Sequence, residues 1–363
     1  MTAGEGAPDI TTFDSDQVEW VEAGWVVDLA DVLPWDNFAT AAKLDGTYPD
    51  QGFPGNYKYN IGATISLLFY NPEIFAELGI EVPEDFQFTA EEFLDVVQTC
   101  SDAGYAGVAD AIGNRAYPGV WAVQYPLFGL VGAEEFDMYN AGLQSWDTPE
   151  ARQALEYSVA LRDAGLWPAS FATMTIDEFH VYFHTQREAC MLFIPTWYAG
   201  RAFKSVDEGG QDPNWHFGML RYPVWDESAA PNALWAQTES GYSVLSTSEN
   251  QDVAKDVLAF ASQPKYGALW TAVTNIPSII KYDSEADWPS EEEQQALGAT
   301  PGQWDWYWAE YNKVYGDMDQ GLALTARCGD FNDAIASALN EGLPQGLISV
   351  DEAIELMDSK LCQ

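Results

Sequence analysis

The sequence has little positive charge and few side chains that bind metal ions. Its 363 residues include 15 Lys and Arg residues, three His and four Cys, and no two Cys form a CxxC pair. A zinc site is therefore not expected. His180 and His184 have the spacing of one helix face, with Glu178 nearby. We interpret them as part of an ordinary helix face, and we expect neither a metal nor a cofactor.

Long apolar runs and enzyme motifs are also missing. No stretch of about 18 apolar residues is present, so no membrane-spanning helix is expected. The sequence contains no GxSxG, no HExxH, no phosphate-binding loop and no GxGxxG after a predicted strand. Carboxylates are numerous, so counting them does not exclude a glycosidase pair, but surface charge explains most of them. We expect a protein that is not an enzyme.

Acidic residues are abundant and are spread along the whole chain. They number 57 against 15 basic residues, which gives a formal charge of −42. A surface of this charge repels nucleic acids and anionic membranes, so neither is expected as a partner. Concentrated salt would screen the self-repulsion. The composition therefore resembles that of proteins from saline habitats, with a generally acidic extracellular protein as the alternative.

The length and the alternation of patterns indicate two lobes of mixed structure. A chain of 363 residues exceeds one ordinary core, and hydrophobic residues make up 47% of it. Apolar, β-branched runs predict strands, and capped segments with helical spacing predict helices. Their alternation predicts an α/β fold with a largely parallel sheet in each lobe. The predicted strands include 61–70, 188–195 and 242–245, and the predicted helices include 73–78, 89–103, 148–165, 250–260 and two within 331–361.

Segments along most of the chain resemble one protein family. The start, Ala7-Pro8-Asp9 with a predicted strand, an acidic turn and a helix, is similar to a segment of the extracellular solute-binding proteins of ABC importers. The chain is thus identified as a member of their sugar-binding family 1, which is maltose-binding-protein-like. It departs from the family pattern at Thr196 and in the Trp-rich stretch from Trp304 to Trp308. Five later segments are similar to the family's motifs and follow in the same order: 65–75 with Gly79-Ile80, 88–93, 187–197, 240–260 and 342–353.

The resemblance implies a two-lobed periplasmic-binding-protein-like fold of type II, in which each lobe is discontinuous. Lobe one would contain residues 1–107 and 247–312, and lobe two residues 108–246 and 313–363. In the family a signal peptide and a strand–helix–strand unit precede the segment that begins here at Ala7, whereas only six residues precede it in this chain. We therefore expect an N-terminally incomplete copy, in which an exposed sheet makes the chain poorly stable.

The function implied by the resemblance is capture of a mono- or oligosaccharide and its delivery to the membrane permease of an ABC importer by hinge closure. The resemblance also implies a periplasmic or extracellular location, with a membrane anchor if the protein is a lipoprotein, and we expect a monomer. One alternative is the same fold binding an amine, a peptide or a compatible solute, because an acidic cleft with Trp favours a cation. A less favoured alternative is an acidic enzyme that processes glycosides.

Aromatic and polar residues stand side by side at several points suited to a sugar. A sugar presents C–H faces that stack on rings and hydroxyls that bond to carboxylates and amides, and the chain has 15 Trp and 18 Tyr. The resemblance places Trp197 where the family stacks a ring on sugar, and Asp16 follows a strand at the end where ligands bind in α/β sheets. The alternatives are core packing for any single Trp, helix capping or a charge at a helix N-terminus for Asp14, and packing of a linker rather than a cleft by Trp304–Trp308. The candidate ligand-binding residues are Asp14, Asp16, Gln17, Tyr59, Asn60, Trp121, Tyr125, Trp197, Trp235 and Glu239.

The four cysteines predict one disulfide bridge. Cys362 is the penultimate residue, and Cys328 precedes the predicted C-terminal helices. We predict that these two residues pair and tie down the last helix. Cys100 and Cys190 are predicted to be free and buried.

Overall fold

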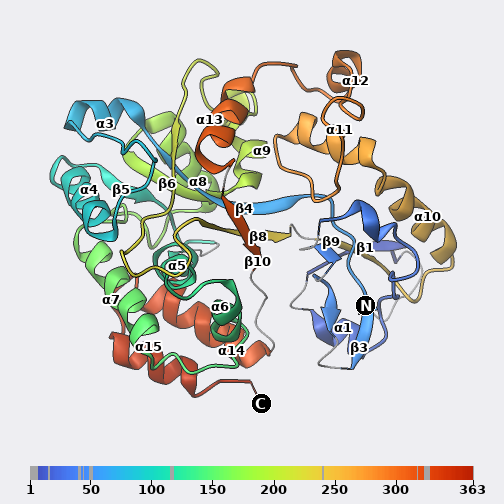
Figure 1. The fold of residues 1–363 in the computed structure, drawn as a ribbon, viewed down its shortest axis with the longest axis horizontal. Coiled ribbons are helices and arrows are strands. Elements are labelled where there is room, and N and C mark those ends of the chain that lie inside the picture. Colours follow the sequence, from blue (N-terminus) through green and yellow to red (C-terminus); the bar gives the residue numbers. More distant parts are fainter. Residues whose placement is uncertain are drawn as a thin grey trace. The chain divides into compact units, whose positions relative to one another are not determined.

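The chain folds into two compact units, each built from two separate stretches of sequence (Figure 1). Unit 1 consists of Met1–Thr64 and Ala236–Gly302, and unit 2 of Ile65–Trp235 and Gln303–Gln363. Each unit is therefore discontinuous, as the resemblance implies. The structure is a computed structural model, and it describes residues 7–14, 17–39, 42–43, 45–48, 52–114, 118–238, 241–316, 318–322 and 328–362.

A sheet of six strands lies mostly in unit 2. Its order is β10-β8-β4-β6-β5, and β7 also pairs with β4. β5 and β6 run parallel, whereas β6 and β7 are antiparallel to β4, so the predicted largely parallel sheet is wrong for the pairs whose register is described. Parallel neighbours require a crossover connection, usually a helix, within the same sheet. β4 instead enters unit 2 across the unit boundary. The strands are β4 (Ala63–Tyr70), β5 (Ala106–Ala109), β6 (Ala189–Pro195), β7 (Gly218–Leu220), β8 (Ala233–Thr238) and β10 (Asp319–Leu322).

The boundaries between the units differ from the predicted lobe boundaries. Residues 65–107 are predicted in lobe one but belong to unit 2, because β4 and β5 both pair with β6. Residues 236–246 are predicted in lobe two but belong to unit 1, and residues 303–312 are predicted in lobe one but belong to unit 2. A segment joins the unit whose strands it pairs with. Those strands are far apart in sequence, so local sequence patterns do not predict the pairing.

Several helices of unit 2 begin or end at residues that satisfy their backbone groups. Thr89 and Glu92 form a reciprocal capping box at the start of α4, and Thr148 caps α7. Gly79 ends α3 with a φ of 69°, in the left-handed region that glycine tolerates. The α-helices of unit 2 are α3 (Pro72–Leu78), α4 (Ala90–Asp102), α5 (Tyr125–Val131), α6 (Ala133–Asn140), α7 (Pro149–Asp163), α8 (Ile176–Val181), α9 (Ala199–Ala202), α13 (Asp305–Tyr315), α14 (Gly329–Ile335) and α15 (Val350–Asp358). Shorter turns are the π-helical η3 (Val120–Gln124), η4 (Tyr182–Gln186) and η7 (Ala336–Gly342), and the 3₁₀ turns η5 (Thr196–Tyr198) and η6 (Val206–Glu208).

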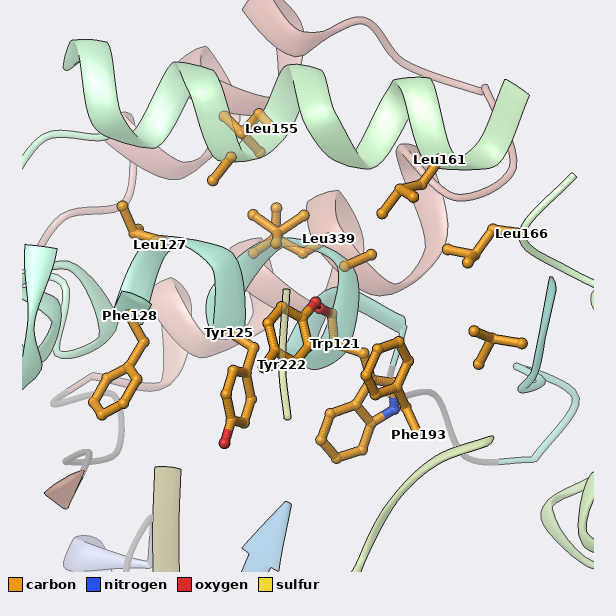
Figure 2. Close-up of a cluster of buried hydrophobic side chains, with 14 of the residues drawn as sticks. Trp121, Tyr125, Leu127, Phe128, Leu155, Leu161, Leu166, Phe193, Tyr222 and Leu339 are labelled. Carbon is orange, nitrogen blue, oxygen red and sulfur yellow. The ribbon is translucent and has the colours of Figure 1, made fainter. Parts of the chain in front are cut away.

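The core of unit 2 surrounds the helix formed by η3 and α5. Figure 2 shows Leu155 and Leu161 extending from α7 toward this helix, and Leu127 on the helix side that faces α7. Trp121 and Tyr125 extend from the opposite side of the same helix (Figure 2). All five side chains are buried. The helix therefore has one aliphatic side against α7 and one aromatic side.

Two disulfides connect elements of unit 2. Cys328 pairs with Cys362, with Cα atoms 5.9 Å apart, which confirms the predicted bridge. Cys100 of α4 pairs with Cys190 of β6, with Cα atoms 6.3 Å apart. The prediction that Cys100 and Cys190 are free is therefore wrong, although both are buried as predicted. The two residues are separated by 90 positions, and only the packing of α4 beside the sheet brings them together.

Unit 1 contains two small antiparallel sheets and a set of helices. β1 pairs with β9 in a register that places Phe13 opposite Gly241, and β2 pairs with β3. A Cβ atom at position 241 would lie 2.5 Å from Cγ of Lys58 and 2.6 Å from the Tyr59 carbonyl oxygen, so the position requires glycine. The elements are β1 (Ile10–Phe13), β2 (Thr47–Tyr48), β3 (Phe53–Asn56), β9 (Gly241–Val244), α1 (Val18–Glu22), η1 (Trp35–Asn37), α10 (Gln251–Ala261), α11 (Pro264–Thr274) and α12 (Glu291–Ala296).

Candidate ligand-binding site

A small cavity in unit 2 is lined mainly by aromatic side chains from separate elements. Its volume is about 10 Å³, measured as the space open to the centre of a water molecule. This is room for about one water molecule, so a larger ligand requires the lining side chains to move. The lining residues are Ser66, Leu67 and Leu68 of β4, Trp121 of η3, Tyr125 of α5, Phe193 of β6, Tyr222 after β7, and Tyr315 at the end of α13.

The rings around the cavity pack face to face. The Tyr125 and Tyr222 rings stack with centroids 4.3 Å apart and an interplanar angle of 22°. The Trp121 and Phe193 rings are nearly parallel at 6.2 Å. Tyr222 lies 5.2 Å from Phe193 and so connects the two pairs. The result is a continuous aromatic wall with contributions from η3, α5, β6 and the segment after β7 (Figure 2).

Hydroxyl groups on this wall bond to backbone atoms and stay neutral. The Tyr125 hydroxyl accepts from the Trp235 backbone N–H at 3.0 Å. The Tyr315 hydroxyl accepts from the Leu68 N–H at 3.1 Å and donates to the Leu220 carbonyl. Burial raises the pKa of Tyr125 and of Tyr315 above the ordinary value of tyrosine. The described residues that line the cavity include no carboxylate and no basic side chain, so the wall offers stacking and hydrogen bonds without charge.

Three predicted site residues, Trp121, Tyr125 and Trp235, lie together in this region. The Trp235 ring is 5.9 Å from the Tyr125 ring. All three side chains are 2–3% exposed, and Trp121 and Tyr125 line the cavity directly. Trp235 packs behind Tyr125 and Phe136, so it agrees with the alternative of core packing.

The family of the chain follows from a comparison with known proteins. The family model described as bacterial extracellular solute-binding protein matches residues 1–268. The chain belongs to this family. The predicted family and the predicted two-lobed α/β fold are thereby confirmed.

Solved structures resemble this solute-binding protein over almost its whole length. One comes from a study of xylan utilization by the thermophilic bacterium Caldanaerobius polysaccharolyticus. It is 19% identical with a TM-score of 0.77, and the match covers 98% of this chain and 86% of that chain. A chitin oligosaccharide binding protein is 15% identical with a TM-score of 0.71 and coverages of 97% and 82%. A cyclic alpha-maltosyl-1,6-maltose binding protein from Arthrobacter globiformis is 20% identical with a TM-score of 0.67 and coverages of 98% and 83%. At these identities the likeness shows the shared fold. Among curated proteins, none matches the chain in sequence.

Trp197 of the solute-binding protein lies in unit 2 but does not line the cavity. It follows β6 in η5 and is partly exposed. The Arg201 guanidinium lies over the ring at 5.4 Å from its centroid, and the His180 ring is 5.8 Å away. Arg201 also pairs with Asp177. Because the guanidinium covers one face of the indole, at most one face remains for a ligand.

His180 and His184 are buried against the turn that carries Trp197. Burial, then the charge of Arg201, holds the pKa of His180 well below its ordinary value, so the ring is neutral. His184 Nδ1 lies 2.8 Å from the Tyr198 hydroxyl and Nε2 lies 3.0 Å from the Gly209 carbonyl oxygen. In the described part of the chain, no group of three or more His, Cys, Asp or Glu side chains is placed to hold a metal ion.

Four other predicted site residues, Asp14, Gln17, Tyr59 and Asn60, lie in unit 1. The Asp14 N–H donates to Gln17 Oε1 at 3.1 Å, and the Gln17 N–H donates to the Asp14 carbonyl at 3.0 Å. Gln17, not Asp14, occupies the N-cap of α1, so the capping alternative for Asp14 is wrong. Both side chains are partly exposed. The predicted residues Asp16 and Glu239 lie outside the described residues.

Tyr59 and Asn60 have structural roles in unit 1. The backbone of Tyr59 exchanges two hydrogen bonds with Tyr242, each of 2.8 Å, and burial raises the pKa of its hydroxyl. Asn60 Oδ1 accepts from the Gly62 N–H at 2.8 Å. Both side chains are buried, and their hydrogen bonds help to shape the turn that follows β3.

The Trp-rich stretch packs within unit 2. Trp304 stacks on Phe203 with centroids 3.9 Å apart, and Trp306 stacks on His216 at 4.4 Å. These contacts favour packing over the alternative of a cleft for Trp304 and Trp306. The segment from Trp304 onward also carries a helical pattern of tyrosines. Tyr307, Tyr311 and Tyr315 recur at every fourth residue, which is the spacing of one helix face.

Six cavity residues were not predicted as site residues: Ser66, Leu67, Leu68, Phe193, Tyr222 and Tyr315. For Tyr315 the helical spacing described above is a usable signal. Ser66 and Phe193 stand inside strands that were predicted as such, but a strand pattern does not tell which face meets a cavity. Tyr222 stands alone before Pro223, and nothing local marks it.

Proposed function

We propose that the protein captures a carbohydrate outside the cytoplasm and delivers it to the membrane permease of an ABC importer. The observation that carries the proposal is the family match over residues 1–268. Proteins of similar fold include binders of chitin oligosaccharide, of raffinose and of cyclic maltosyl-maltose. An aromatic wall without charge suits such a ligand, because sugar C–H faces stack on rings. It offers no counter-charge to an amine, so a carbohydrate is preferred to a cationic solute.

Binding in this proposal selects a closed conformation of the protein. Because each unit is discontinuous, the chain passes between the units at residues 64–65, 235–236 and 302–303. Such connections suit a hinge, and a ligand that binds the closed form better shifts the population toward it. The permease would then recognise the closed, loaded protein. In the described residues, no helix has both the length and the apolar character to cross a bilayer.

The side chains proposed to contact the ligand form two groups. Trp121 and Tyr125 belong to the aromatic wall of unit 2, where they would stack on the ligand after the cavity widens. Trp197, Asp14 and Gln17 are partly exposed and would supply one more ring face and polar groups. Asp16 and Glu239 stay predictions. We further propose that the protein acts as a monomer without catalysing a reaction, in the periplasm or outside the cell, with a lipid anchor if it is a lipoprotein.

A thermal-shift screen tests the proposed ligand class. The folded protein is heated with xylo-, chito- and malto-oligosaccharides and raffinose, and in parallel with glycine betaine, polyamines and short peptides. A ligand that binds only the native state raises the Tm with its concentration. The proposal expects at least one carbohydrate to raise the Tm and to be recovered unchanged by chromatography. A Tm shift caused only by betaine, an amine or a peptide would contradict it, as would cleavage of the carbohydrate.

A further inference from the structure

The helix that carries Trp121 and Tyr125 contains a π turn followed by a proline. Within η3 the Tyr125 N–H donates to the Val120 carbonyl, five residues back instead of the four of an α-helix. The next donor in this register would be the N–H of residue 126, with the Trp121 carbonyl as its acceptor. Residue 126 is proline, which has no N–H. The backbone of this helix therefore cannot supply a π-type hydrogen bond to the Trp121 carbonyl.

The hydroxyl of Tyr222 supplies the missing donor. It donates to the carbonyl of Trp121, and both residues are buried. A buried carbonyl without a donor is costly, because it has lost water and gained no partner. Tyr222 follows β7, about a hundred residues away along the chain, so the bond attaches the sheet region to the π turn.

Tyr222 also orients the neighbouring ring. Its own ring stacks on Tyr125 at 4.3 Å and lies 5.2 Å from Phe193. The residue before the turn is held separately, since the Gly119 N–H donates to Asn340 Oδ1 at 2.9 Å. The π turn is thus held at Gly119 and at Trp121 by side chains from different parts of unit 2.

We propose that Tyr222 is a positioning residue of the ligand site. Its hydroxyl holds the π turn at Pro126 and thereby sets the rings of Trp121 and Tyr125 in the cavity wall. This inference rests on the proposed function, because it assigns the wall to a carbohydrate. It goes beyond that function because it assigns the shape of the site to one hydroxyl group. That hydroxyl group need not touch the ligand.

Tyr222→Phe tests the role of the hydroxyl, with Tyr157→Phe as the matched control. The Tyr157 hydroxyl also donates to a backbone carbonyl, that of Ala90 at 2.9 Å, and Tyr157 does not line the cavity. Both variants should lower the Tm by a few degrees. Carbohydrate affinity, measured by titration of tryptophan fluorescence, should fall about tenfold in Tyr222→Phe, the effect of losing one buried hydrogen bond. It should be unchanged in Tyr157→Phe. Unchanged affinity in Tyr222→Phe would overturn the inference.

A second measurement needs no ligand and separates this inference from the proposed function. Pro126→Ala restores an N–H at residue 126, within reach of the Trp121 carbonyl. The loss of stability caused by Tyr222→Phe should therefore shrink in the Pro126→Ala background, which a double-mutant cycle in urea detects. The near-ultraviolet circular dichroism changed by Tyr222→Phe should return toward that of the parent protein. Strictly additive effects would overturn the role of Tyr222. If the cycle is coupled and no carbohydrate binds the parent protein, the proposed function fails instead.

Discussion

Asp110 is a buried carboxyl group that lacks a basic partner among the described residues. It follows β5, is fully buried, and accepts one hydrogen bond of 2.7 Å from the Ala111 N–H on one oxygen. The other oxygen has no hydrogen-bond partner in the described part of the chain. Burial raises the pKa of Asp110 well above its ordinary value. Stability from this group is therefore complete below the unfolded pKa near 4 and is lost as the pH rises through the folded pKa.

Asp110→Asn should raise the stability of the protein at neutral pH. Asparagine keeps the oxygen that accepts from Ala111 and removes the group that must ionise or hold a proton. We expect a gain in the free energy of unfolding of ~1–3 kcal/mol at pH 7.5, shrinking as the pH approaches 4. Urea denaturation at several pH values measures it, with the exposed Asp31→Asn as the control. A variant less stable than the parent protein at pH 7.5 would mean that the carboxylate is stabilised in solution.

Trp197→Ala separates a ligand contact from a packing role at the turn after β6. The ring is partly exposed and retains at most one open face beside Arg201. If that face stacks on sugar, the substitution should weaken binding by about 2 kcal/mol or more and lower the Tm little. Calorimetry measures the sugar affinity and the Tm of Trp197→Ala and of the control Trp288→Ala, whose ring is exposed. A large fall in Tm with unchanged affinity would place Trp197 in the core.

At the scale of elements, local signals predicted helices well and sheets poorly. The helix starts at Thr89 and Thr148 depend on a side chain and an N–H within three residues, so the sequence contains the whole interaction. The strands at 61–70 and 188–195 were also found. Their mutual direction was wrong, because it depends on how a strand enters a unit. The same limit hid the pair Cys100–Cys190, which forms only once α4 packs on the sheet.

The candidate site shows the same division between local and non-local signals. Trp121 and Tyr125 were predicted because aromatic and polar residues cluster around them in sequence. Tyr222 was not, because its importance comes from the Trp121 carbonyl and the Tyr125 ring, both far away along the chain. The π turn at Pro126 is a local feature, but the donor that completes it is not. Sequence composition therefore predicts the class of ligand better than it predicts which residues line the site.

The two disulfides should open in a fixed order under mild reduction. Cys100 and Cys190 are fully buried, whereas Cys328 and Cys362 are partly exposed. A thiol reagent reaches an exposed sulfur first, because exchange requires attack on the sulfur atom. Brief reduction of the native protein, alkylation and peptide mass mapping should label Cys328 and Cys362 first. Labelling of Cys100 before Cys328 would contradict the burial of the first bridge, and the same treatment in urea is the control.

The whole molecule carries a charge that its ion pairs do not neutralise. It has 57 acidic and 15 basic residues, for a formal charge of −42. The Lys58–Asp45 pair is largely buried, with side chains 5% and 16% exposed. Pairs such as Arg152–Asp351 are well exposed and contribute little. Self-repulsion should therefore limit the stability of the folded state in dilute buffer.

Stability should rise strongly with salt. Between about 0.1 M and about 3 M NaCl the Debye length falls from ~10 Å to below ~3 Å, so repulsion between surface carboxylates is screened. We expect the Tm to increase by on the order of 10 °C, equivalent to a few kcal/mol. Sucrose is the control, because it stabilises by exclusion from the surface and does not screen charge. A Tm that does not change with NaCl would contradict the role of charge.

The central claim is that the protein binds a carbohydrate reversibly and leaves it unchanged. Isothermal titration calorimetry tests it most directly, on protein shown to be folded by circular dichroism in high salt. Xylo-, chito- and malto-oligosaccharides and raffinose are titrated in turn, and the ligand is then recovered and analysed by chromatography. The account predicts saturable binding of at least one of them, with one site per chain and intact ligand. A folded protein that binds none of these carbohydrates, or that cleaves the one it binds, would contradict the account.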